Sequence, residues 1–405
     1  MTLGNSYPGV RVLDLSENIA GPLACMVLGD LGADVVKIER PGVGEATRSL
    51  PPRWGSQSTV FLTVNRNKRS VALDLGSASG RDAALRIGAG CDVVVQSFRP
   101  GVAERLGLDF EALRAVNPDV VYCAISAFGD RPLGRSRPGY DALIQAFTGI
   151  MEMTGDPDGL PARAAPSIVD VSTGLWAAIA IQAALARRGP GVGAQRVESA
   201  LVDSGFFLLC HQVLGYLGTG SFPDRLGSSA PSTAPYQAFR TKGGTIMIAA
   251  ATDRLFRKLC DALELTELAD DDRFATVAAR VAARDDLTDI IETRLGEHSS
   301  EHWLDVIAAA GVPAGPVNDL AAGLSHPVTA ERGLIREADP RDGGTGIENL
   351  KQLRLPIDTE NGCAMLEPPA LGAHTAEVLT EAGFTSDEIS RLLASLPGFE
   401  GAVTP

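Results

Sequence analysis

Residues 9–15, GVRVLDL, and residues 34–38, DVVKI, decide the fold class of this chain. Each is a short apolar run of the kind that forms a strand, and a helix-like segment at residues 23–31 separates them. The three segments together predict a β-α-β unit of about 30 residues, in which a helix joins two parallel strands.

The same alternation of strand-like and helix-like segments continues downstream. Apolar runs at 70–75, 92–96 and 120–125 alternate with helix-like segments at 80–89, 102–106 and 110–117. Near-continuous apolar strands that alternate with helices form a parallel sheet covered on both faces. The first half of the chain is therefore predicted to be a Rossmann-like α/β domain.

Length and composition predict a second domain. A chain of 405 residues, 45% of them hydrophobic, is too long for one core, because single cores stop growing near ~250–300 residues. The Gly/Ser/Pro-rich stretch 218–235 is typical of a linker, so residues 1–217 form the first part of a large domain. A smaller α/β domain over residues 236–330 is predicted from strand-like runs at 236–239 and 245–250 and helical segments at 253–263, 277–295 and 300–309.

Charge, hydropathy and cysteine spacing exclude several classes of protein. A net charge of −14 argues against a nucleic-acid partner, since such proteins concentrate positive charge. The longest apolar stretches, such as 175–185, fall short of the ~18–20 residues that cross a bilayer, and the N-terminus has no signal-peptide pattern. The six cysteines form no CxxC pair, which indicates free thiols in a reducing cytoplasm.

No metal and no permanently bound cofactor are predicted. The segment 16–22, SENIAGP, stands where a dinucleotide-binding domain would carry G-x-G-x-x-G, so NAD and FAD are disfavoured. His298 and His302 have the spacing of a metal pair, but they lie among helix-start residues and are typical of a solvated helix end.

One acidic residue stands out within the segment SIVDVSTG at 167–174. Asp170 follows an apolar pair and precedes a helix-like stretch at 175–188. By itself this arrangement is typical of an aspartate that caps a helix. Its neighbours in the sequence change that interpretation.

Several other motifs occur in a fixed order around Asp170. They are Ala20-Gly21-Pro22, KIERPG at 37–42, NRNKRS at 65–70, SFRPG at 97–101, RPGYD at 137–141, GAQRV at 193–197, PYQAF at 235–239, GVPAGPV at 311–317 and LGAHT at 371–375. Taken together over about Pro8 to Ala394, the set resembles the family III CoA-transferases. That family includes formyl-CoA transferase and the 2-methylacyl-CoA racemases.

The resemblance implies a covalent mechanism at Asp170. In the transferase branch the matching aspartate attacks an acyl-CoA thioester to give a mixed anhydride and CoA thiolate. The thiolate returns to the aspartyl carbonyl, and CoA passes to an acceptor carboxylic acid. A carboxylate suits this task because anhydride and thioester are similarly activated, so neither ATP nor water is needed.

The resemblance also implies the residues that contact CoA and substrate. Arg40 and Arg105 match positions that contact the nucleotide phosphates, and Ile19 stands where formyl-CoA transferase has a glutamine. Ala20, Leu73, Leu75 and Phe98 match positions that line the adenine and pantetheine of CoA. Tyr140 and Asp141 match positions that contact substrate. CoA and acyl-CoA are thus expected as substrates.

Tyr140 separates the two branches of the family. The racemase branch has a histidine here, which works with the aspartate as a pair of bases. Tyrosine, with a pKa near ~10, is a poor base at neutral pH, so transfer is favoured. A 2-methylacyl-CoA racemase or epimerase is the alternative, followed by a non-catalytic CoA-binding or scaffold protein on the same fold.

The segments 138–188 and 235–242 are most similar to members that use succinyl-CoA and a dicarboxylic acid acceptor. The distal carboxylate of such an acid needs a cation, for which Arg48, Arg163 and Arg225 are candidates. The family pattern further implies that residues 331–405 return to the large domain. It also implies that two chains interlock as a homodimer.

Overall fold

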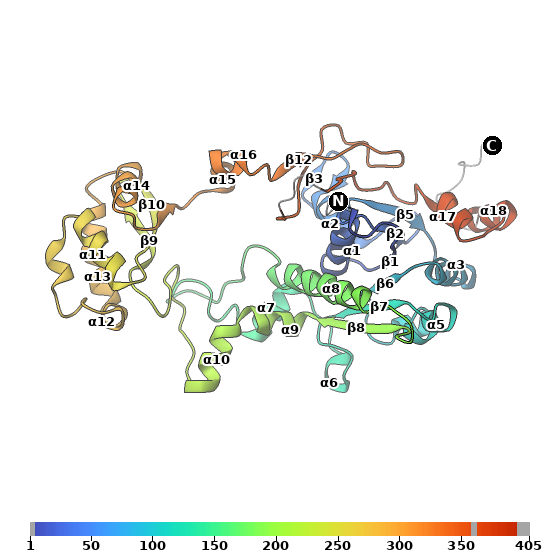
Figure 1. Cartoon of the computed structure of the whole chain (residues 1–405), viewed down its shortest axis with the longest axis horizontal. Coiled ribbons are helices and arrows are strands. Elements are labelled where there is room, and N and C mark those ends of the chain that lie inside the picture. The colour runs from blue at the N-terminus through green and yellow to red at the C-terminus, as the bar shows by residue number, and fades with distance from the viewer. Residues whose placement is uncertain (1–4, 358–362, 395–405) are drawn as a thin grey trace. The chain divides into compact units, whose positions relative to one another are not determined.

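The computed structural model describes residues 5–357 and 363–394, and the chain divides into two compact units (Figure 1). The first unit comprises residues 1–148, 165–210 and 332–405, and the second comprises residues 149–164 and 211–331. The second unit thus takes in the segment 149–164, which the sequence analysis places in the large domain.

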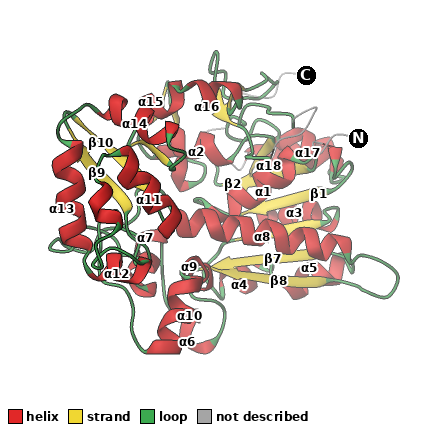
Figure 2. Ribbon diagram, turned by 60° about the vertical axis from the view of Figure 1, so that its left-hand side comes forward, coloured by secondary structure: helices red, strands yellow, loops and turns green. Residues whose placement is uncertain are grey.

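A six-stranded parallel sheet forms the centre of the first unit (Figures 1 and 2). Its strands, in spatial order, are β5 (Lys68–Ala72), β2 (Asp34–Glu39), β1 (Arg11–Leu15), β6 (Val93–Gln96), β7 (Val121–Ser126) and β8 (Gln195–Ala200). In the register of the central strands, Val12 lies opposite both Val35 and Val93. The predicted α/β fold class is confirmed.

The sequence does not predict β8, because its residues QRVESA form no apolar run. β8 is the edge strand beside β7, and Arg196 and Glu198 on it are exposed. An edge strand borders solvent on one side, so its composition carries a weaker signal than that of a central strand.

Helices cover both faces of this sheet. On one face α1 (Ala20–Asp30) packs against α8 (Ile168–Ala186). On the other face α3 (Ala78–Ala89) packs against α5 (Phe110–Val116), over a core that includes Leu13. Burial on both faces explains why Val, Leu and Ile recur in the central strands.

The remaining elements of the first unit are shorter. They are η2 (Ala46–Ser49), β3 (Arg53–Trp54), β4 (Gln57–Ser58), α2 (Thr59–Val64), α4 (Val102–Leu106), α6 (Pro132–Arg135), α7 (Asp141–Thr148), α9 (Leu201–Leu208), β12 (Ile335–Glu337), β13 (Lys351–Leu353), α17 (Thr375–Glu381) and α18 (Ser386–Ala394). The C-terminal part packs on the sheet, because α17 contacts β5 and α3. His374, which precedes α17, has a structural position: its Nδ1 accepts a hydrogen bond from the Ser70 backbone N–H at 3.2 Å.

Helix α8 begins earlier than the sequence predicts. It starts at Ile168 rather than at residue 175, so Asp170 lies within its first turn. The prediction that every apolar stretch is too short for a bilayer is also wrong, because the 19 residues of α8 are long and apolar enough by length and composition to cross one. In the structure α8 contacts α1, α7, α9, β7 and β8 and forms part of the layer that covers the sheet.

The second unit holds a three-stranded antiparallel sheet in the order β11 (Ala314–Pro316), β10 (Gly244–Ala249), β9 (Tyr236–Thr241). Its helices are α10 (Cys210–Thr219), α11 (Asp253–Ala262), η3 (Thr266–Ala269), α12 (Val277–Ala282), α13 (Arg284–Leu295), α14 (Ser300–Ala309), α15 (Leu320–Ser325) and α16 (Pro327–Glu331). The single helix predicted at 277–295 is wrong, because the chain breaks at Ala283, where φ is −109° and ψ is 34°. A core that includes Phe239, Phe256 and Trp303 joins the sheet to α11, α13 and α14.

Candidate active site

A cavity of about 640 Å³ opens at the carboxyl ends of the central strands in the first unit. β1 and β6 are neighbours, but from β1 the chain continues outward to β2 and β5, and from β6 it continues to β7 and β8 on the other side. The loops that follow β1 and β6 therefore diverge, which is where open α/β sheets bind ligands. The volume is that of an ordinary small-molecule site.

The cavity wall comes from seven separate stretches of chain. It consists of Glu17, Asn18, Ile19, Ala20, Gly21, Arg40, Ser97, Phe98, Arg99, Pro100, Val102, Arg105, Ile125, Ser126, Ala127, Arg137, Pro138, Gly139, Tyr140, Asp170 and Leu201. Of the residues predicted from sequence, the structure brings together here Ile19, Ala20, Arg40, Phe98, Arg105, Tyr140 and Asp170.

Three predicted residues do not line this cavity. Leu73 is 1% exposed within the core, and Leu75 packs against the same core. Asp141 is 6% exposed and lies at the start of α7. Their predicted contacts with CoA or substrate stay predictions.

Arginine dominates the charge of the cavity. Arg40, Arg99, Arg105 and Arg137 face only two carboxylates, those of Glu17 and Asp170. This local excess of positive charge lies in a chain of net charge −14 and suits a ligand with several phosphates. Of these arginines, Arg40 lies 3.4 Å from Glu17 in an exposed pair, which holds it only weakly.

Sequence reasoning missed Arg99 and Arg137 as cavity residues. Both lie inside motifs that carry the family resemblance, SFRPG at 97–101 and RPGYD at 137–141. Arg99 follows the predicted strand 92–96 closely, so its place at a strand end was a usable signal. Arg137 precedes α7 on a loop, and no local pattern indicates where that loop lies.

The arginines suggested for a distal carboxylate lie elsewhere. Arg48 forms a bidentate pair with buried Glu39, with N–O distances of 2.6 and 2.7 Å, and lies over the Phe61 ring. Arg225 pairs with Glu152 at 3.0 Å in the second unit. Neither these two nor Arg163 is among the cavity residues.

Asp170 is a partly buried carboxyl in the cavity wall. Burial, and to a smaller extent the neighbouring Asp141 carboxylate, together raise the pKa of this carboxyl to about 7. An aspartate in the first turn of a helix is ordinarily stabilised in its ionised form by the helix dipole. Burial and the like charge of Asp141 act against that stabilisation, and a pKa of about 7 leaves the Asp170 carboxyl only partly ionised at neutral pH.

The Asp141 carboxylate contacts the backbone at the start of α8, next to Asp170. Its Oδ2 accepts hydrogen bonds from the backbone N–H groups of Val169 at 2.8 Å and Asp170 at 3.1 Å. Its Oδ1 accepts one from the Gln145 amide at 2.5 Å. Tyr140, the preceding residue, is by contrast 67% exposed and lines the cavity.

A buried ionic cluster fixes the loop between β1 and α1, which forms one side of the cavity. Lys37 Nζ donates to the Ser16 carbonyl at 2.7 Å, and Lys68 Nζ donates to the Pro22 carbonyl at 2.9 Å. Both ammonium groups also lie within 3.6 Å of Asp14, and all three side chains are fully buried. Against the effect of its burial, the two lysines hold the pKa of the Asp14 carboxyl well below its usual range.

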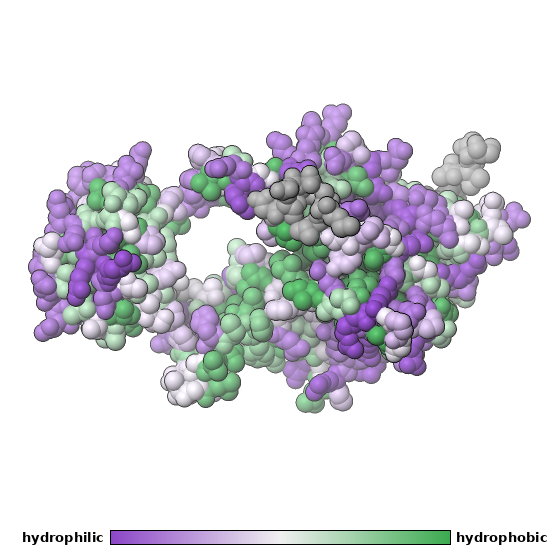
Figure 3. All heavy atoms as spheres, in the orientation of Figure 1, coloured by the Kyte–Doolittle hydropathy of each residue, from purple (hydrophilic) through white to green (hydrophobic). Residues whose placement is uncertain are grey.

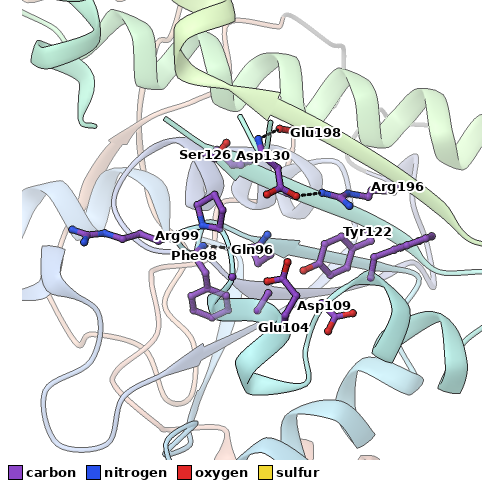
Figure 4. Close-up of a pocket in the computed structure, with 16 residues that line it drawn as sticks. Gln96, Phe98, Arg99, Glu104, Asp109, Tyr122, Ser126, Asp130, Arg196 and Glu198 are labelled. Carbon is purple, nitrogen blue, oxygen red and sulfur yellow. Dashed lines mark hydrogen bonds and ion pairs between the residues drawn. The ribbon is translucent and has the colours of Figure 1, made fainter. Parts of the chain in front are cut away.

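A second, smaller cavity of about 50 Å³ adjoins the first and shares Phe98, Arg99 and Ser126 with it (Figure 4). Asp130 and Arg196 pair across it at 3.0 Å. It is much smaller than the first cavity, and Asp170 does not line it. The larger cavity is therefore the candidate site.

Across residues 5–357 and 363–394, no group of three or more His, Cys, Asp or Glu side chains is arranged to hold a metal ion. The rings of His298 and His302 lie 4.3 Å apart beside Trp303 in the second unit. Ser299 caps the helix that carries His302 by accepting a hydrogen bond from its backbone N–H.

Comparison with known proteins agrees with this geometry. The model of CoA-transferase family III matches residues 7–375. Succinyl-CoA:glutarate CoA-transferase from Mus musculus is 36% identical over 96% of this chain and 89% of its own length. Acetyl-CoA:oxalate CoA-transferase from Acetobacter aceti is 38% identical over 81% of this chain and 85% of its own.

A solved structure shares the whole fold. A CAIB/BAIF family protein from Brucella suis superimposes with a TM-score of 0.81 at 36% identity, covering 93% of this chain and 98% of that one. Family model, relatives and structure agree along nearly the full length, and the chain belongs to CoA-transferase family III.

Proposed function

We propose that the protein is an acyl-CoA:carboxylate CoA-transferase that works through a covalent intermediate on Asp170. The observation that carries this proposal is the position of the Asp170 carboxyl in the wall of an arginine-rich cavity at the switch point of the sheet. Membership of the family supports transfer, and the arginines fit the phosphates of CoA.

The reaction proceeds by exchange of acyl bonds at Asp170. An Asp170 carboxylate oxygen attacks the thioester carbonyl of the donor, the C–S bond breaks, and CoA leaves as a thiolate from a mixed anhydride. The thiolate then attacks the Asp170 carbonyl carbon, which releases the donor acid and leaves CoA on Asp170 as a thioester. The acceptor carboxylate repeats both steps in reverse and departs as the new acyl-CoA.

This sequence neither takes up nor releases a net proton, so it needs no general base. It does need Asp170 in its ionised form, because the carboxylic acid is a poor nucleophile. A folded-state pKa of about 7 therefore places the onset of activity near neutral pH.

We further propose succinyl-CoA as donor and a dicarboxylic acid as acceptor. Relatives named for glutarate, oxalate and mesaconate all take dicarboxylic acceptors. Ile19 in the cavity wall offers an apolar side chain and so gives a small polar acyl group no hydrogen bond. The cavity arginines supply the cations that a dicarboxylate requires.

Racemisation is not proposed. It needs a second base opposite Asp170, and Tyr140 occupies the position where the racemase branch has histidine. No histidine is among the cavity residues.

A homodimer is proposed from the surface of the first unit. Hydrophobic side chains gather over α7, α8 and α9 (Figure 3). Large side chains exposed there are Leu143, Phe147, Val171, Leu175, Trp176, Ile179, Phe206 and Phe207. Apolar patches of this kind rarely face water in a monomer. Separately, the free cysteines, most of them buried, fit a reducing, cytoplasmic location. Light scattering should give twice the chain mass, and Ile179→Asp should lower it.

The covalent mechanism is tested by trapping. Wild type incubated with succinyl-CoA and hydroxylamine should carry a hydroxamate on Asp170, found by peptide mass spectrometry. Asp170→Ala should retain CoA binding and lose transfer to glutarate by more than about a thousandfold. Retention of more than a thousandth of wild-type transfer in the variant contradicts the mechanism.

A further inference from the structure

We propose that Asp141 is a positioning residue that acts through Asp170. Its carboxylate caps the start of α8, the helix that carries the nucleophile. It thereby takes up the backbone N–H groups that would otherwise stabilise the negative charge of Asp170. This inference rests on the proposed function of Asp170. The family pattern assigns this position to substrate, whereas the carboxylate of Asp141 is buried and directed at the backbone of α8.

The cap comes from a different helix. The first N–H groups of a helix lack partners within it, and the residue that precedes the helix usually supplies an acceptor. Ser167, which holds that place before α8, makes no such side-chain bond. Asp141 supplies it from the first turn of α7, by accepting from the second and third residues of α8. The nucleophile's own N–H is one of these groups.

Gln145 fixes Asp141 in this arrangement. It lies one turn further along α7, is fully buried, and donates to the second oxygen of Asp141 at 2.5 Å. Both oxygens of the Asp141 carboxylate are therefore engaged with protein groups. The side chain is held in one place and is occupied by the scaffold of the site.

This arrangement removes a stabilisation of the Asp170 negative charge that free backbone N–H groups would otherwise provide. Free N–H groups at the start of α8 would stabilise a negative charge on Asp170, but here they point at another carboxylate. The other charged groups on elements packed against α8 are Asp30 on α1, Asp203 on α9, and Arg196 and Glu198 on β8; the cavity adds Glu17 and the four arginines Arg40, Arg99, Arg105 and Arg137. Among all of these, Asp141 alone adds to the burial that raises the Asp170 pKa.

The chemical consequence is a more reactive nucleophile. As with thiolates, an ionised group whose surroundings stabilise it less has a higher pKa and attacks more readily. Asp141 thus fixes the backbone at Asp170 and raises the energy of the ionised Asp170 carboxylate relative to its protonated form.

The test separates charge from capping. Asp141→Asn keeps an oxygen that accepts from both N–H groups but loses the charge, whereas Asp141→Ala loses both. Asp109→Asn is the matched control, because Asp109 caps α5 in the ordinary way, by accepting from Glu111 and Ala112 within its own helix. Three readouts apply: the pH profile of kcat/KM, the pH dependence of carbodiimide labelling of Asp170, and hydrogen exchange of the amides at 168–171.

In Asp141→Asn the acid limb of the kcat/KM profile and the labelling curve should both move to lower pH, with slow exchange retained. They should stay above the usual range of aspartate, because burial is the larger cause of the shift. Asp141→Ala should in addition speed exchange at 168–171 by at least tenfold and lower kcat at every pH. Asp109→Asn should leave all three readouts at wild-type values.

An Asp170 labelling curve unchanged in Asp141→Asn overturns the electrostatic role, and unchanged exchange in Asp141→Ala overturns the cap. If Asp141→Ala does not fold, Asp141→Asn still decides the first point, and Gln145→Leu, with faster exchange expected at 168–171, decides the second. Labelling and exchange need no turnover. A wild-type protein that fails to transfer CoA therefore refutes the proposed function and leaves these measurements valid.

Discussion

Replacing the nucleophile should stabilise the protein. Asp170→Asn removes a carboxylate that is partly buried beside a second carboxylate and leaves a side chain of nearly the same shape. We expect the variant to lose transfer and to gain free energy of unfolding at pH 8. Such a trade of stability for reactivity is common where a site holds a charge in an unfavourable place.

The size of the gain follows from the pKa. The folded-state value of about 7 lies above the ordinary value of 3.8, so the folded protein binds more protons between these two values. Stability therefore falls as pH rises through this window, by up to about 4 kcal/mol. Residual contact of the carboxylate with solvent reduces this, and we expect a gain of about 2 kcal/mol for Asp170→Asn at pH 8 and about half of it at pH 5.5.

The assay is urea unfolding of both proteins at the two pH values, at one protein concentration because association shifts apparent stability. Asp203→Asn is the control: Asp203 is an exposed aspartate in the first turn of α9, and its removal should change stability by less than about 0.5 kcal/mol. The reasoning is that the folded protein destabilises the ionised form of Asp170. It is refuted if Asp170→Asn gains no free energy of unfolding, or gains the same amount at pH 5.5 and pH 8.

Three further predictions concern the scaffold, the cavity and the substrates. Lys68→Met should destabilise the fold by about 3–5 kcal/mol in thermal or urea unfolding, since it removes one of two cations from buried Asp14; a loss below about 1 kcal/mol contradicts a clamped loop. Arg99→Ala and Arg137→Ala should each raise KM for acyl-CoA about tenfold with little change in kcat, as loss of one charge-assisted hydrogen bond implies, and unchanged KM would remove that arginine from the CoA site. Succinyl-CoA with a C4 to C6 dicarboxylate should exceed formyl-CoA with oxalate at least about tenfold in kcat/KM, whereas the reverse order would show that Ile19 does not set acyl choice.

The fold class was readable from sequence because buried parallel strands have a strong local signature. The runs at 9–15 and 34–38 became β1 and β2 with small shifts at their ends. Strand β8 and the true start of α8 were not readable, since an edge strand lacks a continuous apolar run and α8 begins at a cap supplied from residue 141. No local pattern records a cap that lies nearly thirty residues away in the chain.

For the candidate site, too, some features could be predicted from sequence and others depend on the tertiary structure. The sequence determined by itself which residue types stand in which motifs, and through their order it named Asp170, Arg40 and the family. Tertiary structure decided which of them meet: it brought Arg99 and Arg137 to the cavity and withdrew Leu73 into the core. It also decided the pKa of Asp170, because burial and the approach of Asp141 from another helix are properties of the folded chain that no local stretch of sequence contains.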